Sequence, residues 1–171
     1  RRGILPKVLT TKAPEPQESR ARLEGLGREA LAAFPGLRIA KDQAYRVFDI
    51  ALDFAEEAPD LGLEFAAEVK DFCEAAGTHA KVSSIHVNAW FGDYDKLSCA
   101  ELFLSRILGI DPIENPRALI FFGDSPNDEP MFRRFPLTCG VANVRRYEKL
   151  MHFPPAYVTE RPFGYGFAEG C

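Results

Sequence analysis

The sequence lacks three features that would place it in a membrane, on nucleic acid or in a disulfide-rich class. No apolar stretch in its 171 residues approaches the roughly 18 that a membrane-spanning helix needs, so we expect no membrane partner. Its 21 basic and 25 acidic residues give a net charge of -4, which offers no electrostatic footprint for nucleic acid. What is present, a hydrophobic content of 46%, is typical of a globular chain that buries a sizeable core.

The cysteines are widely spaced and include no CxxC pair. We therefore expect free thiols in a reducing cytoplasm, ahead of disulfides or thiolate metal sites. The chain also begins with two arginines and no methionine, and we expect it to be a fragment of a longer protein. The cysteines are Cys73, Cys99, Cys139 and Cys171.

The first half of the chain mixes helical and strand patterns. Apolar residues recur at helical spacing in two segments, the first capped by a serine and the second begun by a proline. Two further segments alternate apolar and polar residues, as strands do. These patterns predict an α+β domain at residues 19–90, preceded by an edge strand and linker at residues 1–18. The predicted segments are a strand at 4–9, helices from Ser19 and from Pro59, and strands at 44–54 and 81–91.

After Gly92 the pattern becomes that of an α/β protein. An apolar helix at residues 97–108 ends at Gly109, and the continuous apolar run ALIFF predicts a central parallel strand buried on both faces. The order of strands and helices favours the C-terminal half of a doubly wound parallel sheet at residues 91–171. The segment RPFGYGF predicts a turn at the edge of the core. The later predicted elements are strands at 118–122, 137–144 and 156–159, a short helix from Glu129 and a helix at 145–151.

Two carboxylates follow the predicted strand at 118–122 directly, in the segment FFGDSPND. Asp124 and Asp128 are four positions apart, and Gly123 allows the backbone to turn tightly before them. Ligands of parallel sheets bind beyond the carboxyl ends of the strands, where the next helix also offers free N–H groups. Two carboxylates there suit a hard cation such as Mg²⁺ together with phosphate oxygens. The alternative is a turn in which both acids only cap the helix.

A lysine occupies a similar place earlier in the chain. Lys96, in the segment GDYDK, lies where a loop that follows a strand enters a helix. A cation at this point can neutralise a phosphoryl group bound beside the metal. The alternative is an ordinary surface lysine.

Strand alternation in the α+β domain separates a polar face from an apolar one. If the two predicted strands pair in one sheet, the polar face carries an aromatic ring, two carboxylates, an amide and an imidazole. Such a surface suits a polyhydroxylated ligand, because acids and amides bond hydroxyl groups and a ring stacks on a sugar. A solvated sheet face with ordinary polar residues is the alternative. The candidate substrate residues are Asp49, Asp53, His86, Asn88 and Trp90.

Lys96 before an apolar helix, followed by FFGDSPNDEPMF after a buried strand, resembles motifs III and IV of the haloacid-dehalogenase-like (HAD) phosphatases. The domain before Lys96, with its segment VSSIHVNAWFGDYDK, is similar to the type IIB cap of that superfamily. This branch includes sucrose-phosphate, trehalose-phosphate and mannosyl-3-phosphoglycerate phosphatases. The sequence departs from the pattern at Leu97, where many relatives have glycine.

The resemblance implies a Mg²⁺-dependent phosphatase that hydrolyses a small phosphate monoester, such as a sugar phosphate, through an aspartyl-phosphate intermediate. It implies that Lys96 steadies the phosphoryl group and that Asp124 ligates Mg²⁺. Asp128 would hold Asp124, the metal waters or Lys96 in place, and Ser125 and Asn127 would support the loop.

The nucleophile and the general acid of the family lie in a DxD motif upstream of the cap. We expect no DxD near a strand end in this chain and therefore no activity of the chain alone. Two other interpretations stay open. One is a non-catalytic module with the same fold that binds a phosphate or sugar, and the other is an unrelated α/β protein that binds a metal or phosphate at Asp124.

Overall fold

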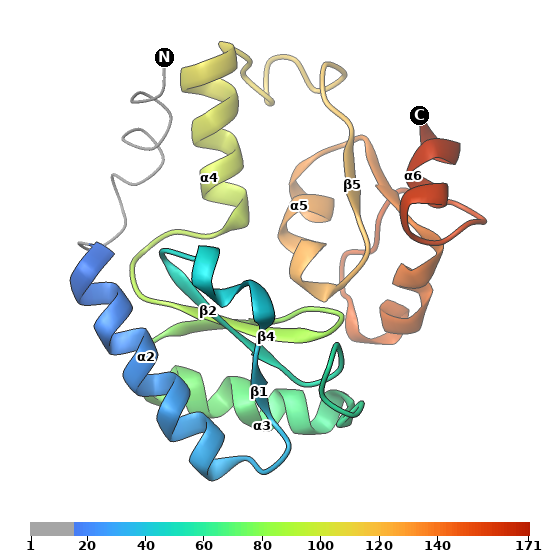
Figure 1. The fold of residues 1–171 in the computed structure, drawn as a ribbon. Coiled ribbons are helices and arrows are strands. Elements are labelled where there is room, and N and C mark those ends of the chain that lie inside the picture. The colour runs from blue at the N-terminus through green and yellow to red at the C-terminus, as the bar shows by residue number, and fades with distance from the viewer. Residues whose placement is uncertain (1–15) are drawn as a thin grey trace. The chain divides into compact units, whose positions relative to one another are not determined.

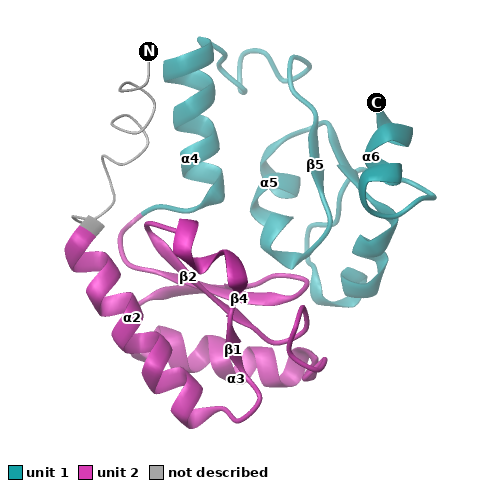
Figure 2. Cartoon of the chain, in the orientation of Figure 1, with its two compact units in different colours: residues 1–11, 94–171 teal, residues 12–93 magenta. Residues whose placement is uncertain are grey.

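The computed structural model describes residues 16–171, which form parts of two compact units (Figures 1 and 2). Unit 2 contains residues 12–93, and unit 1 contains residues 1–11 and 94–171. The strand predicted at residues 4–9 lies outside the described residues. Within residues 16–171, no helix combines the length and apolarity that a membrane crossing requires.

Unit 2 is a four-stranded antiparallel sheet with two helices packed on one face (Figure 1). The strand order is β1-β2-β4-β3, and the register pairs Ile50 with Ala89 and Leu52 with Val87. These four side chains are buried with the apolar faces of both helices in a single core cluster. The elements are α2 (Pro16–Ala33), β1 (Arg38–Ile39), the short helix η1 (Lys41–Tyr45), β2 (Asp49–Asp53), α3 (Gly62–Ala75), β3 (His79–Val82) and β4 (His86–Trp90).

Both helices of unit 2 exist as predicted, but their starts differ from the prediction. Helix α2 begins at Pro16, because proline is favoured in a first helical turn. Ser19 is therefore not a cap but a residue inside the helix with 1% of its surface exposed. Helix α3 begins at Gly62 rather than Pro59, and after it Gly77 adopts a left-handed conformation with φ of 83°.

The segment predicted as a strand at 81–91 is instead parts of two strands. Strands β3 and β4 pair in antiparallel register and are joined by a turn in which Ser83 donates its backbone N–H to the carbonyl of His86 at 2.8 Å. The serine hydroxyl also bonds the backbone of His86, and such local bonds are the reason that serine favours turns. The strand predicted at 44–54 is shortened to β2, because the chain before it forms η1, whose Gln43 bonds the β2 backbone through its side-chain amide.

Unit 1 contains a parallel sheet in the order β5-β6-β7, which confirms the predicted α/β class. The apolar helix predicted at 97–108 is also confirmed, and Gly109 ends it at φ of 67°. The segment RPFGYGF, predicted as a turn, starts a helix. The elements are α4 (Lys96–Phe103) with its continuation η2 (Leu104–Leu108), β5 (Phe121–Gly123), η3 (Pro126–Asp128), α5 (Glu129–Arg134), β6 (Thr138–Gly140), η4 (Ala142–Leu150), β7 (Tyr157–Val158) and α6 (Phe163–Gly170).

Strand β5 differs from the prediction in its surroundings. It lies at the edge of the sheet formed by the described residues, rather than at the centre, and Ile120 just before it is 49% exposed. A continuous apolar run predicts burial on both faces, but only one side of β5 has a neighbouring strand within residues 16–171.

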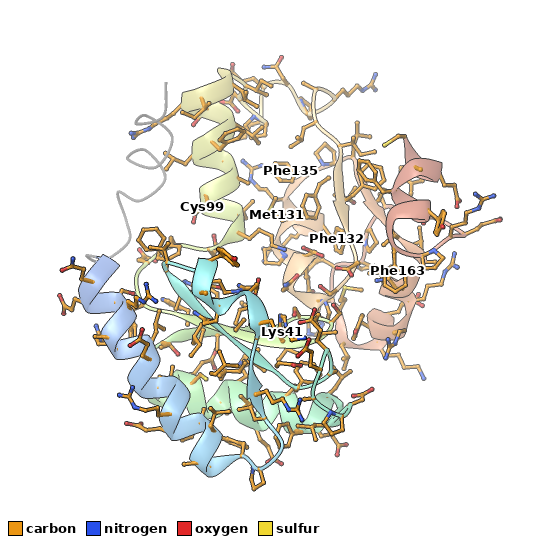
Figure 3. All side chains as sticks on the ribbon, in the orientation of Figure 1. Lys41, Cys99, Met131, Phe132, Phe135 and Phe163 are labelled. Atoms are coloured by element: carbon orange, nitrogen blue, oxygen red, sulfur yellow. The ribbon has the colours of Figure 1, made fainter. Side chains whose placement is uncertain are left out.

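Helix α5 fixes the loop that follows β5. Met131 and Phe135 pack against Leu104 of η2, while Phe132 packs in a cluster with Val144 (Figure 3). An ion pair of 2.5 Å between Arg134 Nε and Glu101 Oε1 also joins this helix to α4. The residues at the start of α5 are therefore held by contacts on two sides.

Candidate active site

Asp128 is the centre of the hydrogen-bond network that follows β5. Its side chain is buried, with 4% of the residue exposed. Oδ2 accepts the backbone N–H groups of Asp124 at 2.8 Å and of Ser125 at 3.3 Å. Oδ1 accepts a bond of 2.5 Å from Lys96 Nζ. One carboxylate thus closes the turn and receives a lysine from another helix.

The turn leaves no room for a larger residue at its start. A Cβ atom on Gly123 would lie 2.7 Å from Asp128 Oδ2 and 2.7 Å from Phe132 Cζ. Ser125, which is 2% exposed, donates its hydroxyl to Asn127 Oδ1 at 2.9 Å. Glycine is therefore required at position 123 by the close packing of the loop on α5, and the Ser125 hydroxyl adds a bond within the loop.

Lys96 is the first residue of α4, and the start of that helix is well defined. Asp95 accepts the backbone N–H of Ser98 at 2.7 Å, and the serine hydroxyl accepts the Asp95 N–H at 2.9 Å. From this capped end, Lys96 Nζ reaches Asp128 and also Asn127 Oδ1 at 3.3 Å. An ammonium group has three donors, so one remains for a ligand. About half of the lysine side chain, 49%, is exposed.

Asp124 lies directly beyond the end of β5 and is only partly buried. Asn143 Nδ2 donates to its Oδ2 at 2.9 Å, while its Oδ1 accepts no hydrogen bond from residues 16–171. Lys96 offsets the charge of Asp128. In the described part of the chain, the carboxylate of Asp124 bonds only the neutral amide of Asn143, which does not offset its charge. An oriented carboxylate with one open oxygen fits a hard cation such as Mg²⁺, which takes one or two carboxylates and completes its shell with water or phosphate oxygens. No cluster of three or more His, Cys, Asp or Glu side chains suited to a metal occurs among the described residues.

Sequence reasoning missed Asn143, which follows β6 at the start of η4. The carboxyl ends of neighbouring parallel strands meet at one edge of a sheet, but the sequence pattern does not show which strands are neighbours. Asp124 follows β5 and Asn143 follows its neighbour β6. The catalytic and metal-binding roles of Lys96, Asp124 and Asp128 stay predictions. The side chains of Lys96 and Asp128 bond each other, and Asp124 bonds Asp128 through its backbone N–H.

The prediction that no DxD occurs near a strand end is wrong, because the sequence contains one just after β4. Asp93-Tyr94-Asp95 follows β4 closely. However, β4 belongs to the antiparallel sheet, and the Asp95 carboxylate caps α4 through its bond to Ser98. This DxD therefore differs in setting from a motif at the end of a parallel core strand.

The five candidate substrate residues share one face of the unit 2 sheet. Strand β2 pairs with β4 so that Asp49 is opposite Trp90, Ala51 is opposite Asn88 and Asp53 is opposite His86. Several of these side chains have partners within unit 2. Asp49 binds Arg46 Nη1 at 2.6 Å, and His86 Nε2 lies 2.9 Å from Glu56 Oε2. The Trp90 ring lies 5.8 Å from the ring of His79. Asn88 Oδ1 is buried and has no hydrogen-bond partner among the described residues.

Asp53 differs from the other four because backbone N–H groups occupy both oxygens of its carboxylate. It is 1% exposed, and its two oxygens accept the backbone N–H groups of residues 55–58 at 2.8 to 3.2 Å. Burial alone would raise the pKa of Asp53, but these four donors together hold it below its ordinary value. The arrangement favours a structural role in place of the substrate contact predicted from the sequence.

Comparisons with known proteins identify the fold. Neither a family model nor a curated protein matches the sequence. A solved structure from Thermoplasma acidophilum matches with a TM-score of 0.56 and 18% identity, over 90% of this chain and 59% of that one. The sucrose-phosphatase of Synechocystis, solved with sucrose and phosphate, matches with a TM-score of 0.55 and 15% identity, over 90% of this chain and 63% of that one. This chain thus spans less than two thirds of the length of either protein, and it shares the α/β fold of the parts that it covers.

Proposed function

We propose that this chain is part of a Mg²⁺-dependent phosphatase that hydrolyses a phosphate monoester, such as a sugar phosphate, through an aspartyl-phosphate intermediate. The observation that carries the proposal is the cluster of Lys96, Asp128 and Asp124 at the carboxyl end of β5. A turn that only caps a helix explains the bonds to Asp128 Oδ2. It does not explain the bond that Lys96 of α4 donates to Asp128 Oδ1. It also does not explain Asp124 Oδ1, which accepts no hydrogen bond from residues 16–171.

Each residue of the cluster has a distinct role in this proposal. The free donor of Lys96 would bind a phosphoryl oxygen and offset its charge. Asp128 would position Lys96 and keep the loop rigid. Asp124 would hold Mg²⁺, which when bound supplies positive charge to the phosphoryl group. Asn143 would fix the orientation of the Asp124 carboxylate.

The polar face of the unit 2 sheet is the proposed binding surface for the hydroxyl groups of the substrate. Support comes from Asn88 Oδ1, which is buried without a partner among residues 16–171. A buried acceptor without a donor costs about 1–3 kcal/mol, and a sugar hydroxyl would relieve that cost. Trp90 on the same face offers a ring for stacking.

Steady-state kinetics of the full-length protein, with Mg²⁺ and a panel of hexose and disaccharide phosphates, test the proposal. We expect Asp124→Asn and Lys96→Met each to lower kcat by about a hundredfold or more, because each removes charge that the transition state needs. The matched control is Asp111→Asn, which alters an exposed aspartate whose carboxylate only bonds the turn after α4.

Two outcomes would contradict the proposal. Near-normal turnover in Asp124→Asn would remove the proposed site, and tight binding of the esters without any turnover would favour the non-catalytic module. The 171-residue chain alone is expected to release no phosphate, since residues 16–171 contain no DxD at the end of a parallel strand.

A further inference from the structure

Phe163 combines two features that neither packing nor backbone preference explains. Among residues 16–171 it is the only residue other than glycine with a positive φ, 52°. That conformation is unfavourable for an L-residue with a side chain. Its ring is 68% exposed, so burial of the ring does not offset the strain. Strain of this kind concentrates at functional sites, and an observed outlier is a reason to look for a function.

A single side chain joins Phe163 to the candidate active site. The backbone N–H of Phe163 donates to Asn143 Oδ1 at 3.2 Å, and Asn143 Nδ2 donates to Asp124 Oδ2 at 2.9 Å. The same amide therefore holds the carboxylate proposed to bind the metal and the first residue of α6.

The start of α6 is held from other directions as well. The carbonyl of Arg161 accepts the backbone N–H of Ala142 at 3.1 Å and the Thr159 hydroxyl at 2.8 Å. The Glu169 carboxylate accepts the N–H groups of residues 160 and 161. A Cβ on Gly166 would lie 2.1 Å from the Arg161 carbonyl oxygen, so the helix packs closely on the segment before it. The strained residue is thus fixed by its surroundings.

We propose that Phe163 is a specificity-determining residue of this site and that Asn143 is its positioning residue. In this proposal the exposed ring, whose backbone is connected through Asn143 to the Asp124 carboxylate, provides an apolar surface against which a ring-shaped leaving group of a phosphate ester packs. A planar or pyranose ring presents an extended face that an aromatic ring can cover, whereas a small acyl group does not. This inference rests on the proposed phosphatase function and adds the leaving-group class that the site prefers.

Two generic phosphoryl substrates with different leaving groups, one a phosphate ester and one an acyl phosphate, test the inference in the full-length protein. They are p-nitrophenyl phosphate, with a planar ring, and acetyl phosphate, with a small acyl group. We expect Phe163→Ala to lower kcat/KM for p-nitrophenyl phosphate about tenfold and that for acetyl phosphate less than about twofold, in keeping with the contribution of an aromatic contact. Asn143→Ala should lower both constants and shift the ratio in the same direction.

Two further variants separate loss of the ring from loss of structure. Phe163→Gly removes the ring and relieves the positive φ, so we expect an unchanged or higher melting temperature with the same change in substrate ratio. Tyr165→Ala is the matched control, because Tyr165 is 73% exposed on the same helix. This second exposed ring belongs to the same helix but does not occupy the position with the positive φ. Its removal should leave the ratio unchanged.

The outcomes distinguish this inference from the proposed function. A wild-type protein that hydrolyses neither substrate contradicts the phosphatase proposal and the inference together. A wild type that hydrolyses both substrates, with an unchanged ratio in Phe163→Ala, contradicts the role of Phe163 alone. An equal shift of the ratio in Tyr165→Ala would also overturn it, because the effect would then belong to α6 in general.

Discussion

Replacing Asp128 with alanine removes the acceptor on which the loop after β5 depends. Two backbone N–H groups lose their partner, and leaving a buried donor without one costs about 1–3 kcal/mol. Ser125 is 2% exposed, whereas Asp124 is only partly buried and its N–H can be hydrated. Lys96 is half-exposed, and the loss of its ion pair adds little. We therefore expect the free energy of unfolding to fall by about 2–4 kcal/mol.

Asp128→Asn should cost less, about 1–2 kcal/mol, because one acceptor oxygen remains. The amide oxygen can serve either the two backbone N–H groups or Lys96, and the NH₂ group then faces a donor on the other side. Neither orientation restores the wild-type network. The stability is thus expected to decrease from the wild type to Asp128→Asn and further to Asp128→Ala, as a direct consequence of the bonding.

Urea unfolding of the 171-residue chain measures these differences. Trp90 is the only tryptophan in the sequence and lies in unit 2, whereas far-UV circular dichroism reports both units. We expect the Asp128 variants to shift the circular dichroism transition and to leave the tryptophan transition nearly unchanged. Asp111→Ala is the control. A loss within about 0.5 kcal/mol in Asp128→Ala, the range of an ordinary surface change, would refute the assignment of Asp128 as the centre of the network.

Two further predictions concern unit 2. The pKa of Asp53 is lowered in the folded state, so its contribution to stability is present above the unfolded pKa of about 4 and is lost as the pH falls through the folded value. Tryptophan-detected unfolding should therefore show stability falling below about pH 4 in the wild type and falling less in Asp53→Asn; equal slopes would exclude the proposed anchoring role. In the full-length protein, Asn88→Ala should lower kcat/KM about tenfold for a hexose phosphate and little for acetyl phosphate. Equal losses on both substrates would assign Asn88 to folding.

Features that depend on local sequence were predicted well. The helix at 97–108 and its end at Gly109 follow from apolar spacing and from the conformational freedom of glycine, and both are confirmed.

The segment at 81–91 was predicted as one strand because alternation continues through the turn at Ser83. A period of two does not reveal where a chain reverses, and only the pairing of β3 with β4 shows it.

Features that depend on partners distant in sequence were predicted poorly. Alternation placed Asp53 on the correct face of β2, but it could not show that the next four residues return to bond its carboxylate. Asn143 was missed because its function depends on β6 lying beside β5, and strand order is not visible in a pattern of residues. A sequence gives the face on which a side chain lies, whereas its partners come from the topology.

The two interpretations of FFGDSPND, a helix-capping turn and a ligand site, concern different atoms of the same segment. Asp128 Oδ2 closes the turn, and Oδ1 of the same carboxylate holds Lys96. The turn therefore places the lysine rather than competing with it for the acid. Asp124 takes part in the turn only through its backbone N–H, so its carboxylate is available for a ligand. A chain that needed the turn alone could dispense with that carboxylate, and for this reason Asp124→Asn is the substitution that separates the two interpretations.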